Sequence, residues 1–148
     1  MEPVVLMPGE GVPVGFGMSV MKATAATTGG AFSMSETTFP PNTGGPPRHV
    51  HERTVDSFYV LEGTLHIWVE DREFDLPAGG YSLVPPGVEH TFANTSDEPV
   101  RFLNLNSPGW FEDYLRDLAE AVEEGIIPGG EEFARIVEKY DIKPVDPA

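Results

Sequence analysis

The sequence predicts an all-β fold, a sandwich or barrel of antiparallel strands, followed by one or two C-terminal α-helices. Three observations support this prediction. Between about residues 15 and 107, short runs with period-two alternation or many β-branched and aromatic residues recur. Clusters of Gly, Pro, Asn and Asp separate these runs, and such short connections favour antiparallel neighbours. After Ser107 the apolar period changes to three and four residues, which indicates helices over about residues 108–141.

The expected strands follow one another along the chain at the close spacing of a sandwich or barrel. They correspond to the runs "MSVMKATA", "AFSMSETTF", "SFYVLEG", "TLHIWVED", "YSLVP", "HTFAN" and "VRFLNLN". The Ser107-Pro108 pair offers an N-cap followed by proline at the first helical position, so the first helix is expected to start there. Its apolar face is expected to lie against the barrel exterior or a partner subunit. The stretch "GIIPGG" should end this helix, and "EEFARIVEKY" predicts a second, shorter one.

Length and composition predict one folded domain, residues 1–148, and exclude several functions. A chain of 148 residues with 40% hydrophobic side chains can bury a single core. Its formal charge of −15 disfavours nucleic acid and anionic membranes as partners. It contains no cysteine, so any metal site must use nitrogen and oxygen ligands. The first residues show no basic region followed by a long apolar run, and a cytoplasmic location is expected.

The stretch "RHVHERTVDSF" carries the first candidate metal ligands. Residues two apart in a strand point to one face, so His49 and His51 can direct both imidazoles to one point inside a barrel. Asp56 lies five residues after His51, and this odd offset would place it on the opposite face of an uninterrupted strand. A turn or bulge within "ERTV" is therefore required if Asp56 is a ligand. Glu52 directly follows His51 and is expected to face outward.

A third histidine, His90, follows a tight turn and shares a strand face with Phe92 and Asn94. If that face is interior, a third imidazole joins the first two. Three neutral imidazoles and one carboxylate suit one divalent Fe, Mn, Ni, Zn or Cu ion, whereas Ca and Mg prefer oxygen ligands throughout. The ligand set leaves the identity of the metal open, because it serves several ions.

The first of these stretches resembles the first motif of the cupin family. That motif runs G, five residues, HxH, three or four residues, Glu, six residues, Gly. In "GGPPRHVHERTVDSFYVLEG", His49 and His51 are followed after four residues by Asp56 and after six more by Gly63. The opening glycine, Gly44, lies one residue closer than the pattern requires.

The second cupin motif runs G, five residues, PxG, two residues, H, three residues, N. The stretch "GGYSLVPPGVEHTFAN" matches it in full, through Gly79, Pro85, Gly87, His90 and Asn94. The two motifs occur in order and at the proper spacing, across about a third of the chain. The resemblance implies a jelly-roll barrel (double-stranded β-helix) of six or more antiparallel strands with a metal inside.

The resemblance also implies the ligands of that metal, namely His49, His51, Asp56 and His90. Asp56 stands where the family usually has glutamate, which is one methylene longer. Three arrangements stay open: direct ligation after a turn brings the backbone inward, ligation through a water, or a coordination position left free for substrate. A turn-capping aspartate is the structural alternative.

Four further residues are candidates for the pocket wall. Phe58 and Val60 share the parity of Asp56, and Phe92 shares that of His90, with simple barrel core as the alternative interpretation. His66, in "TLHIWV", is interpreted as a structural or surface histidine, or alternatively as a donor lining the pocket behind the ligands.

The family contains enzymes, sensors and storage proteins, so the fold does not give the function. The layout with a C-terminal aromatic-rich helix resembles small bacterial cupins of the quercetin 2,3-dioxygenase type. This resemblance implies a metal-dependent dioxygenase acting on a small aromatic or enolisable hydroxy-ketone substrate, with Asp56 as ligand and catalytic base. The alternatives are a non-redox metal-dependent cyclase or isomerase and a small-molecule binding protein without turnover. The resemblance also implies a homodimer.

Overall fold

The computed structural model describes residues 1–127 and 129–145. Its strands are β1 (Val12–Val14), β2 (Ser19–Ala23), β3 (Ser33–Phe39), β4 (His49–Val50), β5 (Val55–Glu62), β6 (Thr64–Val69), β7 (Arg72–Pro77), β8 (Tyr81–Val84), β9 (His90–Ala93), β10 (Val100–Ser107) and β11 (Lys143–Pro144). The helices are α1 (Ala25–Thr28), α2 (Phe111–Glu123) and α3 (Glu131–Glu138).

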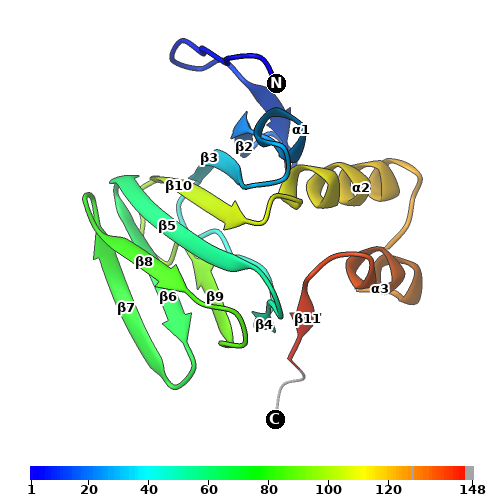
Figure 1. Cartoon of the computed structure of the whole chain (residues 1–148). Coiled ribbons are helices and arrows are strands. Elements are labelled where there is room, and N and C mark those ends of the chain that lie inside the picture. Colours follow the sequence, from blue (N-terminus) through cyan, green and yellow to red (C-terminus); the bar gives the residue numbers. More distant parts are fainter. Residues whose placement is uncertain (128, 146–148) are drawn as a thin grey trace.

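Two antiparallel sheets form the body of the molecule (Figure 1). One has the strand order β1-β2-β3-β10-β5-β8, and the other has the order β11-β4-β9-β6-β7. Side chains from both sheets meet in one core, as expected for a jelly roll. The all-β prediction with two C-terminal helices is therefore confirmed.

The inward faces of β3, β5 and β10 change character along their length. We call the apolar half of the interior the apolar end, formed by Phe39, Phe58, Val60, Leu65, Ile67, Val100 and Phe102. We call the other half the polar end, formed by Ser33, Ser35, Asp56, Asn104 and Asn106 together with three histidines, His49, His51 and His90. The strand register places the polar residues side by side, because Asn106 lies opposite both Ser33 and Asp56. The alternation of inward and outward residues thus continues through β10 while the chemistry of the inward ones changes.

Strand β7 is absent from the runs that the sequence analysis singled out. It forms the end of its sheet, pairs only with β6, and exposes most of its side chains. A strand with so little burial needs no alternation of apolar and polar residues. Its charged side chains suit a sheet edge, because charge opposes pairing with another chain.

The predicted start of the first helix at Ser107 is wrong. Ser107 is the last residue of β10, where it lies opposite Val55, and its hydroxyl donates to the carbonyl of Ala31. That hydroxyl is therefore engaged elsewhere, and α2 begins at Phe111 with Trp110 as an N-cap that makes no side-chain capping bond. The predicted second helix is confirmed as α3.

Both long helices lie beside the barrel, and α2 packs against α3 and β1 (Figure 1). Leu118 and Ala121 are the buried side chains of α2. Within the described ranges, no helix combines the length and the apolar character that crossing a membrane requires.

Candidate metal centre

Three histidines and one aspartate meet at the polar end of the barrel. His49 begins β4 and lies directly opposite His90, the first residue of β9, while Asp56 comes from β5 of the other sheet. One ligand atom from each of His49, His51, Asp56 and His90 lies within 4.8 Å of the others, and all four residues are buried. The structure thus brings together the four residues that the resemblance implied.

The parity problem of Asp56 is solved by the turn that the sequence required. β4 ends at Val50, residues 51–54 form an irregular segment, and β5 begins at Val55. This break resets the alternation, so Asp56 faces inward while Glu52 is exposed, as expected. Gly87 supports the segment, since its N–H donates to the carbonyl of His51 at 2.7 Å. Its φ of 85° favours glycine at this position.

All three imidazoles are held through the same ring nitrogen. The Nδ1 atoms of His49, His51 and His90 lie 2.8, 2.5 and 3.1 Å from main-chain carbonyl oxygens, those of Pro47, Asp141 and Val88 respectively. A carbonyl only accepts, so each Nδ1 carries the hydrogen and each neutral ring presents the lone pair of Nε2. Histidines that ligate a metal are commonly oriented in this way.

The two oxygens of the Asp56 carboxylate have different partners. Oδ1 accepts from the side-chain amides of Asn104 at 2.6 Å and Asn106 at 2.9 Å. Oδ2 faces Nε2 of His90 at 3.0 Å and Nε2 of His51 at 3.4 Å. Asp56 therefore offers a single oxygen to the centre of the cluster.

The distances from Oδ2 of Asp56 to the two imidazoles fit shared binding of a divalent transition-metal ion. With Nδ1 protonated, Oδ2 of Asp56 and Nε2 of neutral His90 both direct lone pairs at each other, and a cation bound by both removes that repulsion. Two ligand atoms at right angles and about 2.1 Å from one ion lie about 3.0 Å apart. The donor set of three nitrogens and one oxygen suits Fe, Mn, Ni, Zn or Cu.

Burial and neighbouring charges set the protonation states of His49, His51 and Asp56. Burial, reinforced by the neighbouring His90, lowers the pKa of His49 to about 4, so this imidazole is neutral at neutral pH. Burial also opposes protonation of His51, but its bond to Asp56 outweighs burial and raises its pKa. Burial would raise the pKa of Asp56, yet the rings of His51 and His90, which can donate to this carboxylate only when they carry a second proton on Nε2, lower it well below its usual range. The carboxylate is thus ionised.

The four pocket candidates lie in two places. Phe58 and Val60 are fully buried in the apolar cluster, and Phe92 packs against that cluster. These three side chains therefore lie in the barrel core, the alternative interpretation given for them. His66 lies away from the ligands, with Nδ1 2.6 Å from Asp75 on the neighbouring strand β7. This contact matches the structural interpretation of His66.

The residues that hold the ligands are not among the predicted site residues. Asn104 and Asn106 share the parity of Phe102 in "VRFLNLN", so their inward direction was readable from the run itself. Asp141, which accepts from His51 through its carbonyl, is 90 residues away in sequence and carries no local signal. Trp110 precedes α2, and its ring centroid lies 5.6 Å from that of His51, a contact that its place in the sequence does not predict.

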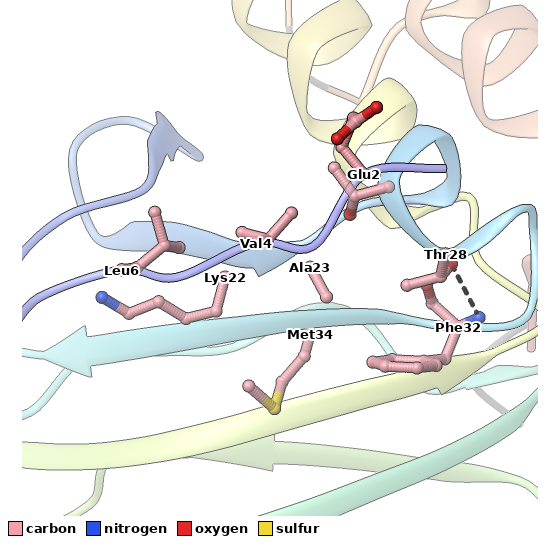
Figure 2. A pocket seen from close by; sticks show the side chains of 9 residues that line it. Glu2, Val4, Leu6, Lys22, Ala23, Thr28, Phe32 and Met34 are labelled. Atoms are coloured by element: carbon pink, nitrogen blue, oxygen red, sulfur yellow. Dashed lines mark hydrogen bonds between the residues drawn. The ribbon is translucent and has the colours of Figure 1, made fainter.

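A separate pocket of about 450 Å³ lies between the N-terminal segment and β2, β3 and α1 (Figure 2). Its apolar lining residues are Val4, Leu6, Ala23, Phe32 and Met34. None of its lining residues belongs to the metal cluster, and its charged members are only Glu2 and Lys22. The pocket therefore offers no grouping of catalytic or ligating side chains.

Comparison with known proteins identifies the domain that contains the candidate ligands. The family model described as a cupin domain matches residues 35–106, which include all four candidate ligands. The quercetin 2,3-dioxygenase of Bacillus subtilis (strain 168) is 30% identical to the chain over 105 residues. The aligned part is 67% of this chain and 31% of that protein, so the chain spans only about a third of its length.

Two solved structures share the fold. A cupin protein from Bacteroides fragilis superposes with a TM-score of 0.57 at 18% identity, covering 72% of this chain and 83% of that one. A predicted oxalate decarboxylase from Thermotoga maritima gives a TM-score of 0.56 at 20% identity, covering 61% of this chain and 78% of that one. The family match identifies residues 35–106 as a cupin domain, and the two sheets and the solved structures show the fold of that family.

Proposed function

We propose that the protein is a metal-dependent dioxygenase of the quercetinase type, acting on a small aromatic or enolisable hydroxy-ketone substrate. The observation that carries this proposal is the buried three-histidine, one-carboxylate cluster, in a chain 30% identical over 105 residues to a quercetin 2,3-dioxygenase. The proposed ligands of one divalent ion are His49, His51, Asp56 and His90. A homodimer stays a prediction.

A transition metal held there supplies Lewis acidity toward substrate oxygens and, for a redox-active ion, access to dioxygen chemistry. The chain's own residues fix the geometry. The three main-chain carbonyls hold the imidazoles in one tautomer, and the two asparagine amides hold Asp56. Such support matters, because small displacements of ligands reduce catalysis strongly.

Asp56 is the residue proposed as both ligand and base, and the geometry favours the first role. Its lowered pKa makes it a weak base in the metal-free protein. The amides of Asn104 and Asn106 oppose the rotation that a carboxylate moving between metal and substrate requires. We therefore propose Asp56 first as a fixed ligand. A substrate proton accepted at this residue would have to reach Oδ2, the oxygen not held by the amides.

The test is elemental analysis of protein purified without added metal or chelator, followed by oxygen-uptake assays with flavonols and simpler enolisable hydroxy-ketones. The proposal expects bound Fe, Mn, Ni or Cu and substrate-dependent oxygen uptake, both lost in His90→Ala. The Glu123→Gln variant serves as a control, because Glu123 is an exposed carboxylate on α2, outside the cluster. A metal-loaded protein that consumes no oxygen with any of these substrates would contradict the dioxygenase assignment.

A non-redox cyclase or isomerase is the second candidate, and the fixed carboxylate favours it. Lewis-acid chemistry needs no mobile base at Asp56. This candidate predicts a zinc-loaded protein whose turnover is the same with and without oxygen. Tight binding of a substrate without turnover in either atmosphere would instead indicate a binding protein.

A further inference from the structure

The C-terminal segment reaches back to the candidate metal ligands at Asp141. Its carboxylate accepts four hydrogen bonds from the turn between β4 and β5. Oδ1 accepts from the N–H of Glu52, and Oδ2 accepts from the N–H groups of Arg53 and Thr54, each at 2.8 Å. The Thr54 hydroxyl donates to Oδ2 at 2.7 Å. Asp141 therefore holds the very turn that brings Asp56 to the inner face.

The main chain of Asp141 contacts a ligand directly. Its carbonyl oxygen lies 2.5 Å from Nδ1 of His51 and fixes the tautomer that presents Nε2 to the cluster. His49 and His90 obtain the same support from residues only two positions away, Pro47 and Val88. His51 alone depends on a distant part of the chain.

Aromatic side chains connect this contact to the C-terminal helices. Trp110 stacks on Tyr140, the residue before Asp141, with ring centroids 5.9 Å apart. The indole Nε1 of Trp110 donates to the Thr54 hydroxyl at 2.8 Å. Further along, β11 pairs with β4, so Pro144 lies opposite His49. The C-terminal segment is thus held on both sides of Asp141.

We propose that Asp141 is a positioning residue of the metal centre, which makes the docked C-terminal segment part of the metal site. Its carboxylate sets the turn that carries Asp56, and its carbonyl orients His51. This inference rests on the proposed metal-binding function. Carboxylates and carbonyls that hold metal ligands affect affinity by about 10- to 100-fold, which sets the expected size of the effect.

The experiment measures zinc and cobalt affinity by competition with a chromophoric chelator in wild type and Asp141→Asn. The asparagine keeps the size of the side chain but presents an NH₂ group to donors that need an acceptor. We expect affinity to fall 10-fold or more and the visible spectrum of bound Co²⁺ to change. Trp110 reports on the same site, because a bound Co²⁺ ion beside His51 should quench its fluorescence in a Trp68→Phe background.

Two controls separate positioning from charge and from stability. Glu138→Gln removes an exposed carboxylate three residues before Asp141 and should leave affinity unchanged. Leu65→Ala lowers stability in the distant apolar end and should also leave the Co²⁺ spectrum unchanged. If Asp141→Asn fails to fold, Thr54→Val, which removes one of the four bonds, should still weaken binding with a measurable loss of affinity.

The outcomes distinguish this inference from the proposed function. Wild-type affinity and spectrum in folded Asp141→Asn, or in folded Thr54→Val when that variant is the one used, would overturn the role of Asp141 and leave the metal site standing. A wild-type protein that binds neither zinc nor cobalt would overturn both proposals. A loss of equal size in Glu138→Gln would show a general charge effect and also overturn the role of Asp141.

Discussion

The apolar and polar ends of the barrel interior lie on the same strands, but apolar packing stabilises the first and hydrogen bonds between buried polar groups connect the second. On β10, Val100 and Phe102 face a packed apolar cluster, whereas Asn104 and Asn106 face Asp56. Burying a side chain such as Phe102 contributes about 1.5–3 kcal/mol to stability. At the polar end, Ser33 Oγ and Asn106 Oδ1 are buried and have no hydrogen-bond partner among residues 1–127 and 129–145, and such a group costs about 1–3 kcal/mol.

The difference shows that the inner face of one sheet can carry residues that stabilise the fold at one end and residues of the candidate metal site at the other. The apolar end supplies the burial that keeps the two sheets together. The polar end tolerates buried charge and unpaired oxygens because it is arranged around the ligand cluster. Changes at one end should therefore affect stability and changes at the other should affect metal binding, and four predictions test this separation.

The largest effect is expected for His90→Ala. His90 is fully buried, contacts Asp56 at 3.0 Å and lies opposite His49, so its loss removes a ligand from the centre of the cluster. Metal should be absent from the purified variant at neutral pH, as measured by elemental analysis. Full metal occupancy in this variant would show that the site lies elsewhere.

Leu65→Ala tests the apolar end. Leu65 is fully buried in the apolar cluster, so the cavity should lower the free energy of unfolding by about 2–5 kcal/mol. Metal affinity of the folded variant should equal that of wild type. Denaturant unfolding and chelator competition measure the two quantities, and a parallel loss of affinity would contradict the division between the ends.

Acidification should weaken metal binding at the polar end in two steps, first through protonation of His51 and then through protonation of His49. His51 has a raised pKa, so in the metal-free protein it holds its proton above the ordinary value of 6.5. Protons compete with metal for Nε2, and affinity should therefore fall as pH drops into the range just above 6.5. His49, with a pKa of about 4, adds to the loss only near that pH. Zinc affinity that stays constant between pH 8 and pH 5 would contradict the role given to His51.

Asn106→Leu should have the smallest effect. The change removes a charge-assisted hydrogen bond to Asp56, worth about 1.5–3 kcal/mol, together with an unpaired buried oxygen that costs about 1–3 kcal/mol. These contributions oppose each other, so thermal stability should change little. Metal affinity should fall about 10-fold, because Asn104 alone then holds Oδ1. A large loss of stability at unchanged affinity would assign Asn106 to packing instead.

Much of the site could be predicted from local patterns. The HxH spacing placed His49 and His51 on one face, and the turn required for Asp56 exists at residues 51–54. The helix start was misjudged because Ser107 looks like an N-cap in sequence, while its hydroxyl bonds to Ala31 in the folded chain. Strand β7 carried no apolar alternation, since an exposed edge strand does not need it.

By itself the sequence determined most of the strand pattern and the two motifs, because strand periodicity and turn chemistry act over a few residues, and the motifs in turn implied the four ligands. Only the tertiary structure decided which groups hold those ligands. Asn104 and Asn106 meet Asp56 across the pairing of β10 with β5, and Asp141 meets His51 from the far end of the chain. Such contacts depend on strand register and on the docking of distant segments, and neither leaves a local signal in the sequence.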